Sequence, residues 1–209
     1  MTTTATLGNS ILNMRSRNHQ SVAVKFKSDG KWLTKTWAEY YDDIETVGCA
    51  MLSLGIKPGD RIAIMSNTRY EWSVTDFALF GIKAIVVPVY QNNTAEDVEF
   101  ILNNSGARFL ICETRGPLKT FESVKDKCPL IEKVIVFENT TTSDTALTWN
   151  KVLEAGRTYK KSHPNAYVSL CETLVPSDTA TLIYTSGTTG RPKGVVLTHL
   201  QAISEVSEA

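Results

Sequence analysis

Glycines and hydroxyl residues gather in one short stretch of the chain, YTSGTTGRPKGVV at residues 184–196. Gly187 and Gly190 permit unusual backbone angles and close approach, so that several N–H groups can converge on an anion. Lys193 adds a single ammonium group to these donors. The hydroxyl groups belong to Thr185, Ser186, Thr188 and Thr189. A polyphosphate, which needs many donors and a cation, is the ligand that fits this set of residues best.

The stretch does not follow the Walker A pattern of nucleotide hydrolases, G-x-x-x-x-G-K-[ST]. Pro192 stands where the second glycine of that pattern would follow Gly187. Gly194, and not a hydroxyl residue, follows Lys193. A plain hairpin connection is the alternative interpretation of such small residues. Apolar segments on both sides and the Pro-Lys-Gly sequence favour a phosphate-binding loop at the end of a sheet, where open α/β sheets bind ligands.

The charge balance of the chain argues against a nucleic-acid-binding protein. Lys and Arg total 22 and Asp and Glu total 22, so the formal net charge is zero. No basic surplus is present to neutralise a nucleic-acid backbone. The hydrophobic content of 42% over 209 residues is ordinary for a globular protein with a substantial core.

The cysteines favour a reducing, cytoplasmic compartment. Cys49, Cys112, Cys128 and Cys171 form no C-x-x-C pair and have no His partner at the spacing of metal ligands. Cys49 and Cys112 lie in apolar segments, which is typical of small core residues. The N-terminus lacks the apolar run of a signal peptide, and no run of about 18 apolar residues predicts a transmembrane segment. Peripheral contact with the inner face of a membrane stays open.

Apolar and amphipathic segments alternate along most of the chain. A β-hairpin is predicted at 21–37 and a helix at 37–55. Apolar strands are predicted at 61–66, 84–89, 108–112 and 133–137. Helices are predicted between them at 71–82, 94–106 and 115–127. Strands that are apolar throughout, each followed by a helix, indicate an α/β fold: a doubly wound, mostly parallel sheet with helices on both faces.

The remaining segments complete this picture. We predict a polar surface loop at 138–148, a helix at 148–163, a connector at 164–178, and strands at 179–185 and 194–199. Residues 1–20 are expected to be poorly ordered. A helix begins after His199, and the chain ends inside it without a cap. We therefore expect the chain to be a piece of a longer polypeptide.

The sequence YTSGTTGRPKGVVLTH resembles the phosphate-binding signature of the adenylate-forming superfamily: acyl-CoA synthetases, luciferases and the adenylation domains of peptide synthetases. The pattern N-x-R-x-E-W from Asn67 to Trp72 and the sequence VPVY from Val87 to Tyr90 resemble the long-chain fatty-acyl-CoA synthetase branch. The likeness covers the chain from about the hairpin onward. It implies that residues 1–209 are an incomplete N-terminal portion of an AMP-binding domain whose C-terminal domain is absent.

The resemblance implies a function and its site residues. ATP would activate a long-chain fatty acid to an acyl-adenylate, and CoA would then displace AMP. The residues that would hold the β- and γ-phosphates are Thr185, Ser186, Gly187, Thr188, Thr189, Gly190 and Lys193. Thr185 would also help to ligate Mg²⁺. The alternatives are a different carboxylate as substrate (short-chain, aryl, or one passed to an acyl carrier protein) and a nucleotide-binding module without turnover.

Much of the family's site comes later than residue 209. The resemblance places the adenine and ribose contacts, the second Mg²⁺ ligand and a catalytic lysine beyond that point, so no catalytic residue is assigned here. We expect this chain to be inactive by itself. We also expect it to self-associate, because a sheet cut at this point exposes an edge and an apolar face.

Several other residues are weighed and not assigned to the site. His199 is expected to be a hydrogen-bonded structural imidazole, and Trp72 a core residue. Tyr90 is the better candidate for facing a substrate channel. Glu71 and Asp76 lie five residues apart, which does not place two carboxylates on one helical face, so they are not a paired acid and base. The cation Arg191 is interpreted as a solvated charge.

Overall fold

The computed structural model describes residues 6–28, 30–139, 145–185 and 191–207. Within these residues, a seven-stranded sheet has the order β7-β6-β5-β3-β4-β8-β9. Its strands are β3 (Arg61–Met65), β4 (Ile85–Val89), β5 (Phe109–Cys112), β6 (Lys133–Val136), β7 (Ala146–Thr148), β8 (Thr179–Thr185) and β9 (Lys193–Thr198). Neighbours from β7 to β8 are parallel, and β9 alone pairs antiparallel, with β8. The predicted mostly parallel α/β sheet is confirmed.

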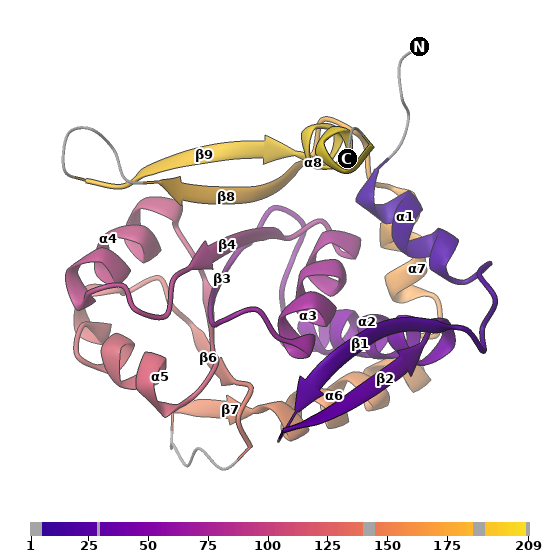
Figure 1. Ribbon diagram of the computed structural model, residues 1–209. Coiled ribbons are helices and arrows are strands. Elements are labelled where there is room, and N and C mark those ends of the chain that lie inside the picture. Colours follow the sequence, from indigo (N-terminus) through magenta and orange to yellow (C-terminus); the bar gives the residue numbers. More distant parts are fainter. Residues whose placement is uncertain (1–5, 29, 140–144, 186–190, 208–209) are drawn as a thin grey trace.

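Helices cover both faces of the sheet, as predicted (Figure 1). They are α1 (Leu7–Met14), α2 (Trp37–Ser53), α3 (Tyr70–Gly81), α4 (Ala95–Ser105), α5 (Arg115–Glu122), α6 (Trp149–Ser162), α7 (Ala166–Glu172) and α8 (His199–Ser207). The helices α4 and α5 lie on one face, and α2, α3 and α6 lie on the other. Both α2 and α4 begin with a capping box, formed by Thr36 with Glu39 and by Thr94 with Asp97.

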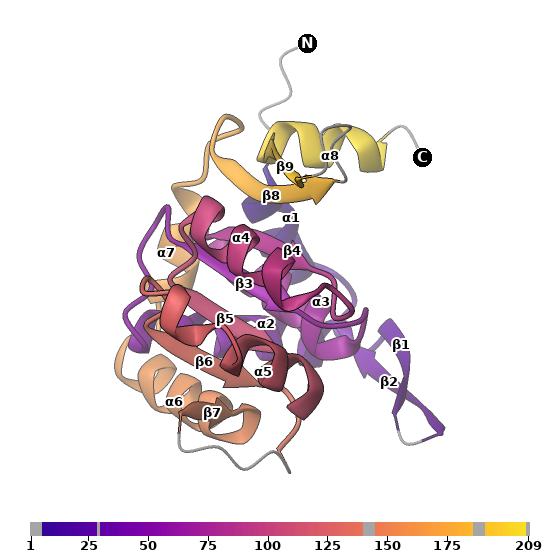
Figure 2. The ribbon, with the colours of Figure 1, turned by 90° about the vertical axis from the view of Figure 1, so that its left-hand side faces the viewer.

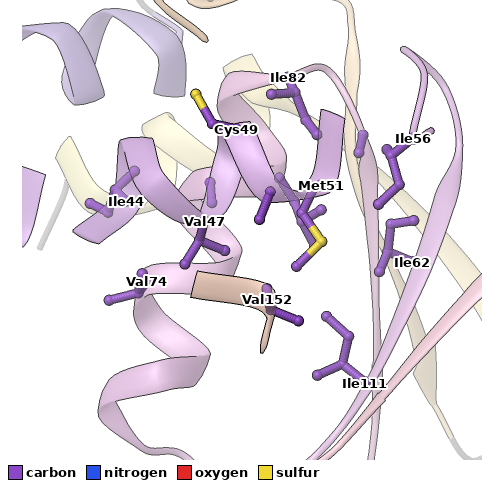
Figure 3. Close-up of a cluster of buried hydrophobic side chains, with 14 of the residues drawn as sticks. Ile44, Val47, Cys49, Met51, Ile56, Ile62, Val74, Ile82, Ile111 and Val152 are labelled. Carbon is purple, nitrogen blue, oxygen red and sulfur yellow. The ribbon is translucent and has the colours of Figure 1, made fainter. Parts of the chain in front are cut away.

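Each face of the sheet carries its own apolar core. The larger core lies between the sheet and α2, α3 and α6, which contribute Ile44, Val74 and Val152, respectively (Figure 3). Side chains of β3 alternate between the two cores: Ile62 and Ile64 pack in the larger one, and Ala63 and Met65 in the smaller one. Since both faces are buried, β3 must be apolar from Ile62 to Met65.

The predicted hairpin is confirmed as β1 (Val22–Ser28) and β2 (Lys31–Thr36). Gly30 has φ 78°, the left-handed conformation that favours glycine in a tight turn. The hairpin forms a separate two-stranded sheet and stands out from the body of the molecule (Figure 2).

The predictions for three segments, 138–148, 164–178 and 115–127, were wrong or incomplete. The segment 138–148 is not loop to its end, because β7 pairs parallel with β6 over Ala146–Thr148. The expected connector at 164–178 contains α7, whose Tyr167 is fully buried. The predicted helix at 115–127 is α5 followed by a separate 3₁₀ turn, η1 (Lys125–Lys127). The range 1–20, expected to be poorly ordered, contains α1 with a buried Ile11.

Cys49 and Cys112 are core residues, as expected, and Cys128 and Cys171 are buried as well. All four are free and buried, and burial raises the pKa of the Cys49 thiol to about 11. No helix in the described part of the chain is both long and apolar enough to span a bilayer.

Candidate functional site

The described ends of the glycine- and hydroxyl-rich loop are held by β8 and β9. Thr185, the last residue of β8, is the register partner of Lys193, the first residue of β9, and both are exposed. Directly paired residues of antiparallel strands project from the same face. The structure therefore brings the predicted Mg²⁺ hydroxyl and the predicted phosphate-binding ammonium to one face of one strand pair. The predicted residues Ser186, Gly187, Thr188, Thr189 and Gly190 lie outside the described residues.

Tyr184 anchors this strand pair to α4. Its side chain lies on the opposite face from Thr185 because side chains alternate along a strand. The Tyr184 hydroxyl donates a hydrogen bond to Asn104 Oδ1 at 2.7 Å, and its ring meets Phe100 edge-on at 6.5 Å between centroids. Across the pair lies Gly194, where an added Cβ would come within 3.1 Å of the Tyr184 ring. The tyrosine is thus enclosed between a glycine and α4.

A cleft of about 490 Å³ lies at the carboxyl ends of β3, β4 and β8. Its lining combines side-chain amides, hydroxyls and apolar groups: Ser66, Asn67, Thr68, Trp72, Pro88, Val89, Tyr90, Gln91, Asn92, Ile183 and Tyr184. Ile183 lies two residues before Thr185 on the same face of β8, so Thr185 is on the face that borders the cleft. The loop therefore starts at the edge of the sheet where α/β proteins bind ligands.

Tyr90 and Trp72 both line this cleft, with different surroundings. Tyr90 is 72% exposed and lines the cleft, so it is not a core residue. Trp72 packs against the larger core, as expected, and also forms part of the cleft wall. Sequence reasoning set Trp72 aside because aromatic residues early in amphipathic helices are usually core; here the residue has both positions.

The charged residues of the N-x-R-x-E-W motif fix the β3–α3 connection. Arg69 pairs with Glu71 (Nε to Oε2, 2.7 Å) and lies 3.7 Å from Glu113, which follows β5. The backbone N–H of Asn67 also donates to Glu113, at 2.9 Å. The charged side chains of Arg69 and Glu71 are thus bound within this connection. Asn67 and Trp72 are the motif residues that line the cleft.

Asp76 is a buried carboxyl behind the cleft wall. Burial raises its pKa to about 7, and a side-chain hydrogen bond with Trp72, one turn earlier on α3, opposes that rise. Its Oδ1 has no hydrogen-bond partner among the described residues. No second carboxylate accompanies it here, which agrees with the prediction that Glu71 and Asp76 are not an acid/base pair. Its contact with Trp72 makes Asp76 a residue that fixes the cleft wall.

A larger hollow of about 750 Å³ lies on the other side of the strand pair, along α4, and its charged lining is mixed. Three carboxylates line it: Glu96, Asp97 and Glu99. Arg191, at the start of the described return from the loop, also lines it and lies over the Phe100 ring at 5.7 Å. Lys127 lines it too and forms an ion pair with Glu99 at 3.2 Å. Carboxylates still outnumber cations here, which disfavours a polyphosphate, so the smaller cleft near Thr185 is the better candidate.

His199 does not match its predicted hydrogen-bonded state. It is fully buried at the start of α8, edge-on to Phe80 at 5.9 Å, and neither ring nitrogen has a partner in the described structure. Burial lowers its pKa to about 4, since the charged imidazolium would lose its hydration. The residue is structural, as predicted, but it is a buried neutral ring that packs on Phe80, with the Lys83–Asp178 ion pair nearby.

Comparisons with known proteins agree on one family. The family model described as AMP-binding enzyme matches residues 13–209. The long-chain-fatty-acid–CoA ligase FadD15 of Mycobacterium bovis is 36% identical over 181 residues, which is 87% of this chain and 29% of the relative. Fatty acyl-CoA synthetase A of Dictyostelium discoideum is 30% identical over 199 residues, covering 87% of this chain and 28% of the relative.

Solved structures share the fold. The anthranilate CoA ligase AuaEII in complex with anthranoyl-AMP matches with a TM-score of 0.76 at 22% identity, over 95% of this chain and 36% of the other. A Mycobacterium tuberculosis fatty acyl CoA synthetase matches with a TM-score of 0.71 at 20% identity, over 93% and 34%. This chain spans less than a third of the length of the two curated relatives. The match over residues 13–209, together with the loop sequence and its place at the sheet edge, shows that the chain belongs to the AMP-binding enzyme family.

Proposed function

We propose that the protein containing this chain activates a long-chain fatty acid with ATP and transfers the acyl group to CoA. The carrying observation is the pairing of Thr185 with Lys193 beside a cleft at the sheet's carboxyl edge, in a chain of the AMP-binding enzyme family. The choice of a fatty acid is supported by relatives described as fatty-acid–CoA ligases in two distant organisms.

The proposed first step needs positioning and charge compensation more than acid–base chemistry. A carboxylate oxygen of the fatty acid attacks the α-phosphorus of ATP, and the bond from that phosphorus to the pyrophosphate oxygen breaks. Because a fatty acid is ionised at neutral pH, no general base is required. Lys193 and the hydroxyl of Thr185 would neutralise the departing pyrophosphate, and each such donor contributes about 3 kcal/mol to a transition state. In the second step the CoA sulfur attacks the acyl carbon and AMP leaves.

The residues present are compatible with Mg²⁺ bound chiefly through ATP. A hydroxyl oxygen such as that of Thr185 is a donor that this hard cation accepts. No cluster of three or more His, Cys, Asp or Glu residues in the described part of the chain could hold a metal ion. Phosphate oxygens would therefore provide most of the ligands, and the ion would offset phosphate charge.

Exchange of radiolabelled pyrophosphate into ATP tests this function in the full-length protein. We expect exchange that depends on a long-chain fatty acid and falls steeply with short-chain or aryl acids. Lys193→Ala should lower the rate by about a hundredfold, corresponding to one lost donor. Lys151→Ala, which removes an exposed lysine of α6, is the matched control and should leave the rate unchanged. Undiminished exchange in the Lys193 variant would refute the assignment, and a preference for aryl or short acids would refute the substrate class.

We also propose that residues 1–209 by themselves do not form acyl-adenylate. The described residues offer the ends of a phosphate loop and a cleft, and the family resemblance places the adenine and ribose contacts and a catalytic lysine after residue 209. The same exchange assay on this chain should give no signal above background. Fatty-acid-dependent exchange by the isolated chain would contradict this proposal without affecting the assignment of the full-length protein.

A further inference from the structure

The β1–β2 hairpin presents an aromatic and basic face to solvent. Trp32 is 64% exposed and Val22 is 58% exposed, which is costly for side chains of this kind. Lys27 is the register partner of Trp32, and Lys25 lies two residues earlier on the same face. Lys25 Nζ lies 5.1 Å from the centroid of the Trp32 ring. Two ammonium groups therefore flank one exposed indole.

The opposite face of the hairpin holds it firmly on the body of the protein. Phe26 stacks on Tyr70 of α3 with ring centroids 4.4 Å apart. Lys35 forms an ion pair with Asp43 of α2 at 2.8 Å, and the Tyr70 hydroxyl donates to the same carboxylate at 2.6 Å. The hairpin is thus held in place by contacts with α2 and α3, and the exposure of its other face does not result from loose packing (Figure 2).

The charge of the hairpin differs from that of the whole chain. Four lysines lie between residues 21 and 36, against a single acid, Asp29, in a chain whose formal net charge is zero. Lys25, Lys27 and Lys31 are exposed and form no ion pair within the described residues, whereas Lys35 is paired. The positive charge is therefore concentrated where the indole is exposed.

We propose that this hairpin face, defined by Val22, Lys25, Lys27 and Trp32 together with the exposed Lys31 beside the turn, is a docking surface for an anionic lipid membrane. Indole rings partition to the headgroup level of a bilayer, and lysines next to them are attracted to anionic headgroups. Single-stranded nucleic acid, which also binds basic and aromatic surfaces, needs a free ring face for base stacking. Here Lys25 lies over the Trp32 ring, and an exposed Val22 favours acyl chains over bases.

Membrane docking would add to the proposed function, but the observations that support it are independent of that function. A long-chain fatty acid partitions strongly into bilayers, so a surface that holds the protein at a membrane would place it beside its substrate. Three lysines and one tryptophan give weak, reversible binding, because each basic residue near an anionic surface contributes modestly. Binding is measured without turnover, so failure of the proposed function and failure of docking are distinguishable.

Sedimentation of the full-length protein with sucrose-loaded vesicles tests the proposal. We expect binding to phosphatidylcholine vesicles that contain 30% phosphatidylserine, loss of binding at high salt, and little binding to pure phosphatidylcholine. The triple variant Lys25→Gln, Lys27→Gln, Lys31→Gln should bind roughly a hundredfold more weakly. A charge-matched control replaces three exposed lysines elsewhere: Lys119→Gln, Lys125→Gln, Lys151→Gln. The control should keep binding within about threefold of the unmodified protein.

Trp32→Ala separates insertion of the indole from charge attraction. Because Trp32 is exposed, the variant should keep its melting temperature and yet bind vesicles several-fold more weakly. Absence of vesicle binding would overturn the proposal, as would equal binding by the two triple variants. Binding of a single-stranded oligonucleotide without binding of vesicles would assign the face to nucleic acid and also overturn it.

Discussion

At the scale of single residues, the alternation of side chains along β8 gives neighbouring residues different roles. Tyr184 projects toward α4 and Thr185 projects from the opposite, exposed face of the strand, so one residue can anchor the strand while the next presents a donor. Asn104 accepts the hydrogen bond from the Tyr184 hydroxyl, and this bond fixes the end of β8 next to the loop. We expect the precision of the phosphate-binding donors to depend on this anchor, since small displacements of positioned groups reduce rates strongly.

Tyr184→Phe should therefore weaken ATP use more than it weakens the fold. Losing one hydrogen bond costs about 1 kcal/mol of unfolding free energy. In pyrophosphate exchange by the full-length protein, KM for ATP should rise several-fold while KM for the fatty acid stays constant. Tyr41→Phe is the matched control, because the buried Tyr41 hydroxyl has no partner in the described structure. Equal KM values for ATP in both variants would show that the anchor does not position the loop.

The unpartnered imidazole of His199 should make stability fall in mild acid. Its pKa of about 4 in the folded protein lies below the value of 6.5 for an ordinary imidazole. The unfolded chain therefore takes up a proton first as the pH falls below 6.5. The folded state loses about 3 kcal/mol relative to the unfolded state between that pH and 4. This contribution is absent above 6.5 and constant below 4.

Urea unfolding of this chain from pH 7.5 to pH 4 measures the effect. Relative to the unmodified chain, His199→Phe should gain about 3 kcal/mol of unfolding free energy between pH 6.5 and pH 4, because phenylalanine cannot be protonated. The buried Asp76 carboxyl titrates in the same range in both proteins, so this difference, and not the slope of one profile, is the measurement. His19→Phe, at an exposed position, should keep the slope of the unmodified chain. A profile for the His199 variant that parallels the original would contradict a buried neutral imidazole.

At the scale of elements, sequence patterns predicted the regular βα units and missed the elements held by tertiary contacts. The strands β3 to β6 are apolar apart from Arg61 and Lys133 at the first positions of β3 and β6, and capping residues mark α2 and α4, so local sequence identifies them. The helix α7 has only 7 residues, too few to show a period, and its order comes from the burial of Tyr167. The strand β7 has 3 residues and depends on pairing with β6.

The packing of α7 depends on two glycines in other helices. The Tyr167 ring lies against Gly48 of α2 and Gly81 of α3, where a Cβ on either glycine would overlap it. The Tyr167 hydroxyl also donates to the Phe77 carbonyl at 2.9 Å. Two glycines on different helices thus form a recess for one tyrosine. Neither glycine carries a local sequence signal of this role.

Gly81→Ala should destabilise the chain by about 1–3 kcal/mol, the usual cost of inserting a methyl group into a packed core. Gly116→Ala in α5 is the control, since its added Cβ would meet only Thr114 Oγ1, at 3.7 Å. The control should be neutral or slightly stabilising, because alanine favours the helix. Thermal unfolding of both variants gives the comparison. Equal melting temperatures would mean that α7 can shift to accommodate the methyl group.

At the scale of the whole molecule, the signature loop could be recognised from its residue types, but its neighbourhood could not. Composition and spacing predicted the donors Thr185 and Lys193, and the strand pairing brings them together. Sequence alone could not indicate that carboxylates of α4 line the hollow on one side of the strand pair, or that Asn104 anchors Tyr184. These contacts join segments about 80 residues apart, beyond any local pattern.

The sheet ends at β9, whose outer edge pairs with no strand in the described residues. Val195 and Val196 of β9 are 44% and 55% exposed, and Ile183 of β8 adds to this apolar surface. An unpaired edge with apolar side chains favours association with another copy. We therefore expect the isolated chain of 209 residues to self-associate, with a sedimentation coefficient that rises with concentration.

The double variant Val195→Lys, Val196→Lys should restore the monomer, because charges on an edge strand oppose pairing. Val22→Lys, an equally exposed valine on the hairpin, should leave association unchanged. If the unmodified chain is a compact monomer at high concentration, the exposed edge of β9 does not cause self-association.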